Sequence, residues 1–441
     1  MDPLYSWAWV EAQSAETAGV WNACAADPMP DAPRYSAPEQ TKREKAYDEG
    51  LETVERELKR ARGSRTAAGR RETQQRVTSA FARFSAAALD LSDDCIELLT
   101  DDFLPVGTKL AKWARHFDPR LSMADIVQAC RNAWTACGLQ PLLGVPIGLT
   151  PSILGYSLLY PYSDNYLDGE DVTAEAKLRF SQRFRERLRG EPLAAAGERE
   201  AALWVMVDLI EAQYPRSRYP DVFACLLAIH RAQEQSIAQV RSRCSDAELL
   251  EVSCAKGGSS VLADGCLARG SLAPEESRFS FEWGVLLQLG DDLQDVREDM
   301  RRGSVTLFSG AAARGDLLDG RVRQLLAFSE RVGAQMEGLA HGNPMLKGLL
   351  RMSWRSLILM AVAESHEYFS PGFLEEAEAF SPFRFGFLRE RRERLAGRQG
   401  LYAMLFDAFV EAPDGGDAAA SHRGRSEDRV PAAVTAEAPP A

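Results

Sequence analysis

The sequence has few of the residues from which metal-binding cysteine and histidine sites are built. Its 441 residues include eight cysteines and five histidines, and no two cysteines form a C-x-x-C pair. Zinc sites usually combine such a pair with further cysteines or histidines, so we expect no zinc site. Cysteines scattered singly along a long chain are typical of small buried hydrophobic residues in a reducing compartment.

Basic residues are outnumbered by acidic ones, with 52 lysines and arginines against 64 aspartates and glutamates. The formal net charge is −12 at pH 7. A general nucleic-acid-binding protein needs a basic face, so we expect no nucleic-acid partner. An acidic balance does not exclude an anionic small substrate, because bound metal ions reverse the local charge.

No unbroken apolar run has the length of a membrane span. Residues 132–163 hold no charged residue, but prolines and glycines interrupt them. We therefore expect a loop followed by a buried helix from about Pro151, and no transmembrane span. The first residues show neither the basic nor the long apolar region of a signal peptide, so a cytoplasmic location is expected.

Strand signals and internal repeats are weak, whereas helical spacing is common. Apolar residues recur every three or four positions in segments such as 222–240 and 279–296. We predict a single all-α domain at 76–411, with many helices around one core. Residues 1–75 are predicted to be an extension, irregular up to about residue 40 and then either loose or an exposed charged helix. Residues 412–441 are predicted to be a disordered tail.

A first acidic cluster follows directly after the charge-free segment. Asp164 and Asp168 are one helical turn apart and share a face, and Asp171 extends this face if the helix continues past Gly169. The order of the two segments predicts carboxylates at the mouth of an apolar cavity.

A second acidic cluster lies on another expected helix. Asp291, Asp295 and Asp299 are spaced by four residues, and Asp292 flanks them. Like charges stacked on one helical face are destabilising unless a cation compensates them. Magnesium accepts one or two carboxylates, waters and phosphate oxygens, so it is the natural compensation. Either cluster alone also fits a solvated helix face, but together they favour a shared metal–diphosphate site.

The motifs resemble those of class I isoprenoid synthases. Gln288-x-x-Asp291-Asp292-x-x-Asp295 is similar to the second Asp-rich motif of head-to-tail prenyl diphosphate synthases. The continuation through residues 295–307, with D-x-x-E-D and R-R-G, instead resembles squalene and phytoene synthases. The first cluster resembles the D-x-x-x-D of that branch and departs from D-D-x-x-D, because Asn165 holds the second position.

This resemblance implies an all-α helical bundle around a deep central cavity, and a Mg²⁺-dependent reaction of a prenyl diphosphate. Several Mg²⁺ ions would act as Lewis acids on the departing diphosphate, and a dry cavity with aromatic walls would then steer the carbocation. The implied metal ligands are Asp164, Asp168, Asp291, Asp295 and Asp299, with Asp292 as a further catalytic carboxylate. Either cavity wall or plain core is expected for Tyr156, Tyr160, Tyr162, Tyr166, Phe223, Phe281 and Trp283.

Diphosphate also needs cationic or polar partners. Lys256 precedes a Gly-Gly pair, which suggests a helix break with free backbone N–H groups or a close backbone approach. The resemblance further points to Gln288, and spacing alone points to Arg243 or its neighbour Arg241. Arg301 and Arg302 follow the second cluster and could close over the phosphates, or simply solvate a helix end.

Three functions remain open at this stage. The first is a terpene synthase that ionises one prenyl diphosphate. The second is a condensing enzyme, either a head-to-tail prenyltransferase or one similar to squalene and phytoene synthases. The third is a non-catalytic protein that binds prenyl diphosphates. The second motif departs from the N-D-x-x-S-x-x-x-E of ordinary terpene cyclases, but the segments expected for isopentenyl diphosphate recognition are missing, so a non-standard terpene synthase is favoured. The resemblance also leaves a homodimer open.

Overall fold

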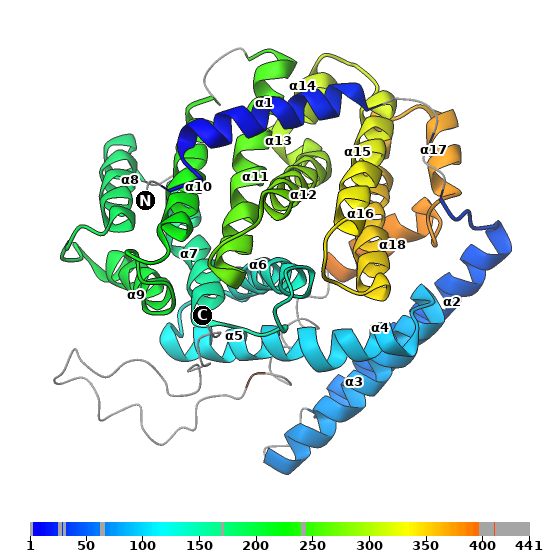
Figure 1. The fold of residues 1–441 in the computed structure, drawn as a ribbon. Coiled ribbons are helices and arrows are strands. Elements are labelled where there is room, and N and C mark those ends of the chain that lie inside the picture. The colour runs from blue at the N-terminus through cyan, green and yellow to red at the C-terminus, as the bar shows by residue number, and fades with distance from the viewer. Residues whose placement is uncertain are drawn as a thin grey trace.

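The computed structural model describes residues 3–24, 29, 32–61, 67–168, 172–239, 244–396 and 410. Every regular element in this part of the chain is helical, which confirms the all-α prediction (Figure 1). The elements are α1 (Trp7–Ala23), α2 (Ala37–Ala61), α3 (Ala67–Leu89), α4 (Asp93–Glu97), a π-helical turn (Leu98–Phe103), α5 (Leu104–Phe117), α6 (Met123–Leu142), α7 (Pro151–Asp168), α8 (Ala174–Arg189), α9 (Glu198–Gln213), α10 (Pro220–Gln239), α11 (Asp246–Arg269), α12 (Pro274–Gln294), α13 (Val296–Arg302), α14 (Leu307–Ala313), α15 (Asp319–Glu337), α16 (Pro344–Glu364), a 3₁₀ turn (His366–Tyr368), α17 (Pro371–Glu378) and α18 (Phe385–Ala396).

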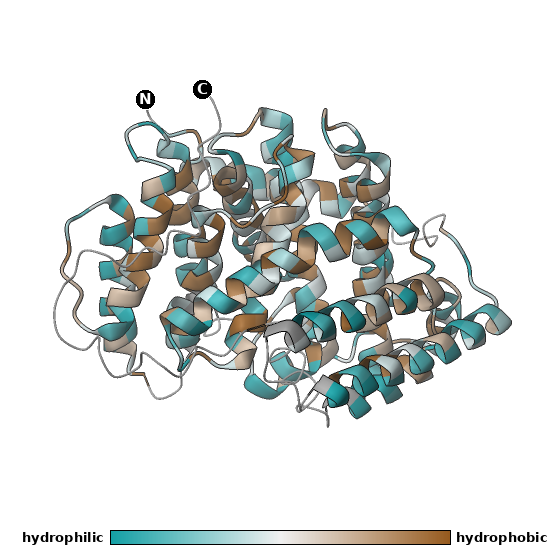
Figure 2. Cartoon of the chain, turned by 90° about the horizontal axis from the view of Figure 1, so that it is seen from below, coloured by the Kyte–Doolittle hydropathy of each residue, from teal (hydrophilic) through white to brown (hydrophobic). Residues whose placement is uncertain are grey.

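Helices α11 and α12 form the centre of the molecule, and the hydrophobic residues gather on the inner faces of the helices around them (Figures 1 and 2). Ser245 and Glu248 form a capping box that starts α11, and Gly270 ends it in a left-handed conformation. Helix α11 runs unbroken through Gly257 and Gly258, so the expected helix break is wrong. The alternative, a close backbone approach, is confirmed. A Cβ atom on Gly257 would lie 2.4 Å from the carbonyl oxygen of Gly284 in α12.

The expectation of an irregular segment up to residue 40 is wrong. Helix α1 forms there and crosses over the ends of the central helices (Figure 1). Its Val10 and Trp21 side chains are buried, and the Trp21 ring meets Phe328 of α15 edge-on at 5.9 Å between centroids. Part of the buried face is polar, with Gln13 and Thr17, so the sequence lacks the apolar stripe that would have predicted a packed helix.

The charged segment after residue 40 adopts the helical alternative. Helices α2 and α3 form an antiparallel pair that projects from the body (Figure 1). The Tyr47 ring of α2 contacts Phe383 and Phe387, and Arg391 of α18 forms an ion pair with Asp48. These contacts attach the pair to the body along one side. The predicted tail at 412–441 lies outside the described residues.

The charge-free segment 132–163 contains the end of one helix, a loop, and then the buried helix that was expected from about Pro151. Helix α6 continues to Leu142, and the loop after it is held by two hydrogen bonds between the Gln140 side chain and the backbone of Gly148, at 2.8 and 3.0 Å. Helix α7 then begins at Pro151, as predicted. Within the described residues, no helix combines the length and apolar character needed to cross a membrane.

Candidate functional site

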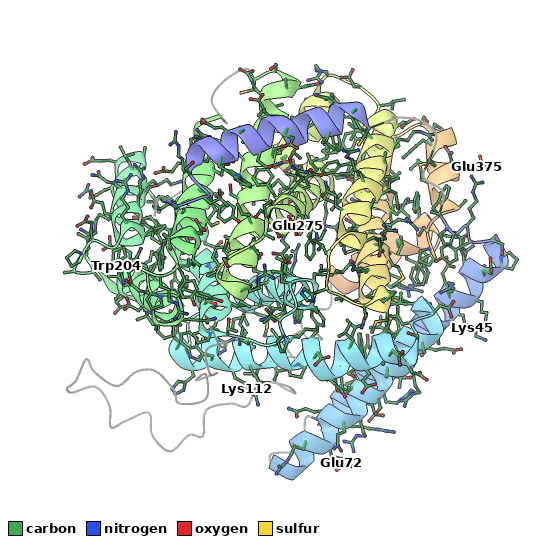
Figure 3. All side chains as sticks on the ribbon, in the orientation of Figure 1. Lys45, Glu72, Lys112, Trp204, Glu275 and Glu375 are labelled. Carbon is green, nitrogen blue, oxygen red and sulfur yellow. The ribbon has the colours of Figure 1, made fainter. Side chains whose placement is uncertain are left out.

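A cavity of about 880 Å³ lies between the central helices and α6, α7, α10 and α16. One end is lined by acidic and cationic side chains, and much of the remaining wall is apolar. Side chains occupy the space between the ribbons elsewhere in the body (Figure 3). The apolar wall includes Leu226, Ile229, Val261, Leu286, Leu287, Leu350, Leu357 and Ile358.

The register of three helices brings the two acidic segments to the same end of α11. In α7, the Ser152 hydroxyl donates to the carbonyl of Leu267 at 2.9 Å, and the Tyr156 hydroxyl lies 3.4 Å from Ser260. Helix α7 therefore runs antiparallel to α11, and its carboxyl end approaches the level of Ser253. The Ser253 hydroxyl donates to Asp292 of α12 at 2.9 Å, so the acidic end of α12 lies at this level too.

Asp164 and Asp168 occupy this end of α7, but their side chains lie outside the described residues. Two neighbours of theirs on α7, Ser163 and Leu167, line the cavity. Asn165, which replaces the second acid of the D-D-x-x-D pattern, instead donates from its side chain to Asp125 at 2.6 Å. The helix backbone at Asp164 and Asp168 therefore lies beside the cavity.

Three carboxyl groups of the second cluster, those of Asp291, Asp295 and Asp299, line the cavity. Burial raises the pKa of Asp291 to about 6, and nearby Asp292 and Asp295 add to the rise while Arg131 opposes it. Burial raises the pKa of Asp299 to about 7, again with help from Asp292 and Asp295. The pKa of Asp295 is raised by burial and by Glu298. The carboxylates therefore repel one another at an end of the cavity that reaches solvent, since the Asp291 side chain is 57% exposed, and such a cluster of negative charge favours a cation.

Asp292 differs from the other acids because both of its carboxylate oxygens have partners. The Gln288 side chain donates to Oδ1 at 2.8 Å, and the Ser253 hydroxyl donates to Oδ2 at 2.9 Å. Burial raises the pKa of Asp292, and these two hydrogen bonds oppose the rise. Asp292 and Gln288 both line the cavity, but in this geometry they position each other and join α11 to α12.

Two cations face the acids across the cavity. Lys256 of α11 lines the wall, as the sequence predicts for a diphosphate ligand. Arg131 of α6 also lines it, with Nη2 at 3.8 Å from Oδ1 of Asp291. Arg131 is a site residue that sequence reasoning missed. It lies in an ordinary amphipathic helix, and only the packing of α6 against the central helices reveals its position.

The remaining predicted cations are placed elsewhere. Arg302 forms an ion pair with Glu298 and is 72% exposed, and Arg301 donates to the carbonyl oxygen of Arg297 at 3.2 Å. Neither lines the cavity in this structure. Arg241 and Arg243 lie outside the described residues.

The aromatic candidates separate into wall and core. Tyr156 and Trp283 line the cavity, and Trp354 of α16 joins them, with its ring centroid 5.5 Å from that of Trp283. Phe281 is completely buried and packs beneath Gly258, so it belongs to the core. The cavity lining also excludes Tyr162, Tyr166 and Phe223, and the side chain of Tyr160 lies outside the described residues.

The donor set at the acidic end suits magnesium in a particular way. Among the described residues, no three histidine, cysteine, aspartate or glutamate side chains converge closely enough to hold a metal ion by themselves. Magnesium does not require such a cage, because it keeps several waters and binds one or two carboxylates together with substrate phosphate oxygens. Asp291, Asp295 and Asp299 therefore fit Mg²⁺ that arrives with a phosphorylated ligand, rather than a resident structural metal.

All eight cysteines are free thiols, and six of them are buried. This agrees with the prediction that they are small core residues, and none of the eight lines the cavity. In comparisons with known proteins, no family model, no curated protein and no solved structure matches this chain.

Proposed function

We propose that this protein is a Mg²⁺-dependent class I terpene synthase that ionises one prenyl diphosphate. The observation that carries the proposal is the convergence of Asp291, Asp295 and Asp299 with Lys256 and Arg131 at one end of a cavity that has extensive apolar walls. A prenyl diphosphate has the same division, with a strongly anionic head on a hydrocarbon chain. The charged end of the cavity suits the diphosphate with its Mg²⁺, and the apolar wall suits the hydrocarbon chain.

The protein's own groups would act on the two parts separately. Lys256 and Arg131 would hold the diphosphate oxygens, and the carboxylates of α12 and α13 would hold Mg²⁺ at the same end. Bound Mg²⁺ supplies Lewis-acid withdrawal of charge from the leaving diphosphate. The apolar wall excludes water from the hydrocarbon, and the ring faces of Tyr156, Trp283 and Trp354 favour positive charge near them.

The cations also bear on which reaction is favoured. Lys256 and Arg131 are the only lysine and arginine side chains among the described residues that line the cavity. A head-to-tail condensing enzyme must bind a second diphosphate, which needs a second group of cations. One cationic pair therefore supports a reaction of a single diphosphate.

The test is product analysis with purified protein, Mg²⁺, and geranyl, farnesyl or geranylgeranyl diphosphate, each with and without isopentenyl diphosphate. We expect a terpene hydrocarbon or alcohol by mass spectrometry from one of the single diphosphates. A longer diphosphate or a joined hydrocarbon would assign the protein to the condensing class instead. Absence of turnover and of diphosphate binding in folded protein would refute both enzymatic assignments.

Two variants make the assay specific. The double variant Asp291→Asn, Asp295→Asn removes two cavity carboxylates with little change of shape and should lose the product. Glu275→Gln makes the same acid-to-amide change on an exposed residue (labelled in Figure 3) at the amino-terminal end of α12, the opposite end of this helix from Asp291. It should retain the activity of the unsubstituted protein.

A further inference from the structure

Asp264 of α11 is a buried carboxyl group that the proposed chemistry at the acidic end leaves unused. It lines the cavity, is 3% exposed, and its Oδ1 atom has no hydrogen-bond partner. A buried polar atom without a partner is costly in free energy, so such atoms in folded proteins usually have a role or a missing partner.

The position of Asp264 along α11 indicates which part of a ligand it would meet. Lys256, Ser260 and Asp264 are spaced by four residues, and all three line the cavity. Lys256 and Asp264 are therefore about 12 Å apart along the helix axis. Asp264 lies away from the acidic end, at the depth where an otherwise hydrocarbon chain would finish.

The nearby polar groups do not satisfy this carboxyl. Ser260, one turn closer to Lys256, is already in contact with the Tyr156 hydroxyl at 3.4 Å. The Cys137 thiol, close enough to sense the charge of Asp264, points its hydrogen bond to the carbonyl of Gly148. Asp264 is thus left facing the cavity without an internal partner for Oδ1.

Trp283 supplies a second unpaired group in the same wall. It is 3% exposed, lines the cavity, and its indole Nε1–H has no hydrogen-bond partner. An indole N–H only donates. Burial raises the pKa of Asp264 well above its ordinary value, which favours the neutral carboxyl, and that form can donate a hydrogen bond as well as accept one.

Two buried polar atoms without partners thus line this cavity, and a plain hydrocarbon offers neither of them a hydrogen bond. We propose that the inner part of the cavity binds an oxygen atom on the hydrocarbon end of the ligand through Asp264 and Trp283, so that the ligand is an oxygenated isoprenoid. The oxygen belongs to a hydroxyl, ether or carbonyl group remote from the diphosphate. This inference rests on the proposed function for the placement of the diphosphate beside Lys256.

The test compares two uncleavable ligands, farnesyl thiolodiphosphate and its analogue with a hydroxyl group on the terminal carbon. Binding to the full chain with Mg²⁺ is measured by titration calorimetry. We expect the hydroxylated analogue to bind at least about tenfold more tightly, because the unmodified chain leaves both polar atoms unpaired. Equal binding, or a preference for the unmodified chain, would overturn the inference and show that water satisfies the carboxyl.

Substitutions separate recognition from folding. Asp264→Leu removes the unpaired carboxyl at similar volume and should fold, yet it should lose most of the preference for the hydroxylated analogue. Asp264→Asn keeps a donor and should retain most of that preference, and Trp283→Phe should reduce it. A preference that is unchanged in Asp264→Leu would contradict the assignment, since the ratio of two affinities is insensitive to a general loss of stability.

The inference can fail independently of the proposed function. If neither thiolodiphosphate binds, diphosphate recognition is refuted, and the same variants are then tested with farnesol and the corresponding saturated hydrocarbon. A preference for the alcohol that disappears in Asp264→Leu would still support an oxygen site in the cavity. Equal affinity for the two neutral ligands would exclude it.

Discussion

Two antiparallel helix pairs in this molecule are held together by different means. Helices α11 and α12 touch through their backbones, where a Cβ on Gly284 would lie 2.1 Å from the carbonyl oxygen of Gly257. Helices α2 and α3 touch through side chains, with the rings of Tyr47 and Phe84 meeting edge-on at 5.1 Å. Backbone contact fixes position far more strictly than contact between rotatable rings. The pair that carries the cavity walls is therefore the one built for fixed geometry.

A glycine-to-alanine substitution in each helix pair gives the strongest test of this difference. Gly257→Ala places a methyl group against a backbone carbonyl that cannot turn aside, so we expect a loss of about 3 kcal/mol in the free energy of unfolding. Gly50→Ala meets the Phe84 side chain at Cδ2 (2.7 Å) and Cβ (2.9 Å), so the two helices must shift slightly, but no backbone atom blocks the methyl group. Alanine also favours a helix over glycine, so the change should stay within about 1 kcal/mol. Urea denaturation followed by circular dichroism measures both, and equal losses would contradict the distinction.

The second prediction concerns the carboxylates that the fixed pair presents to the cavity. Asp295→Asn should lower the proposed Mg²⁺-dependent turnover by at least about 100-fold, because it removes a carboxylate that we propose binds the cation. Glu52→Gln, an exposed acid on α2, should leave turnover unchanged. Steady-state kinetics with the active diphosphate measures both variants. A comparable loss in the α2 variant would show that general acidity, and not position, matters.

The third prediction uses the buried carboxyl of α11. Asp264 has a pKa raised well above 3.8 in the folded protein by burial. Between the unfolded and folded pKa values the folded state holds a proton that the unfolded state releases, so stability falls as pH rises, by up to about 1.4 kcal/mol per unit. Asp264→Asn lacks this titration. Its gain in unfolding free energy over the unsubstituted protein should therefore be larger at pH 8 than at pH 5, and a constant difference would count against a buried neutral Asp264.

The fourth prediction concerns protons and Mg²⁺ at the acidic end. The pKa values of about 6 for Asp291 and about 7 for Asp299 mean that both groups are largely protonated at pH 5 and largely ionised at pH 8. Only the ionised form binds a cation, so Mg²⁺ affinity measured with thiolodiphosphate present should rise by at least about tenfold over this range. In the double variant Asp291→Asn, Asp299→Asn most of this rise should disappear. If it persists, the titrating groups lie elsewhere.

The smallest effect is expected in the side-chain pair. Asp48→Ala breaks the bond from Nε of Arg391, which is 2.6 Å long, and should destabilise the attachment of α2 by less than about 1 kcal/mol. Amide hydrogen exchange should become faster in α2 and α3, while turnover stays the same. A fall in turnover would mean that this pair communicates with the cavity.

The sequence predicted those features that depend on short-range spacing, although the single helix expected for the second acidic cluster is divided at Asp295 into α12 and α13. The acids of α12 and α13, Lys256 and the close approach at Gly257 all follow from local pattern, and all prove to lie at the cavity or at its wall. Arg131 and Asp264 could not be predicted in this way, because their roles arise from contacts between helices distant in the chain. Helix α1 was missed for a different reason, since Gln13, Ser14 and Thr17 on its buried face interrupt the apolar stripe that predicts a packed helix.

Helix α1 has a consequence for how the chain acquires its structure. The Tyr5 hydroxyl is hydrogen-bonded to Ser277, and the Gln324 side chain donates to the carbonyl of Trp21 at 2.8 Å. The ribosome makes α1 before either partner and before α11, on which α1 also packs, so α1 cannot complete its docking until α15 has been synthesised. Contacts across such long sequence separations close late and slowly. During translation, Trp21 and the apolar residues around it stay uncovered for most of the chain's synthesis, which makes this segment a natural binding point for a chaperone.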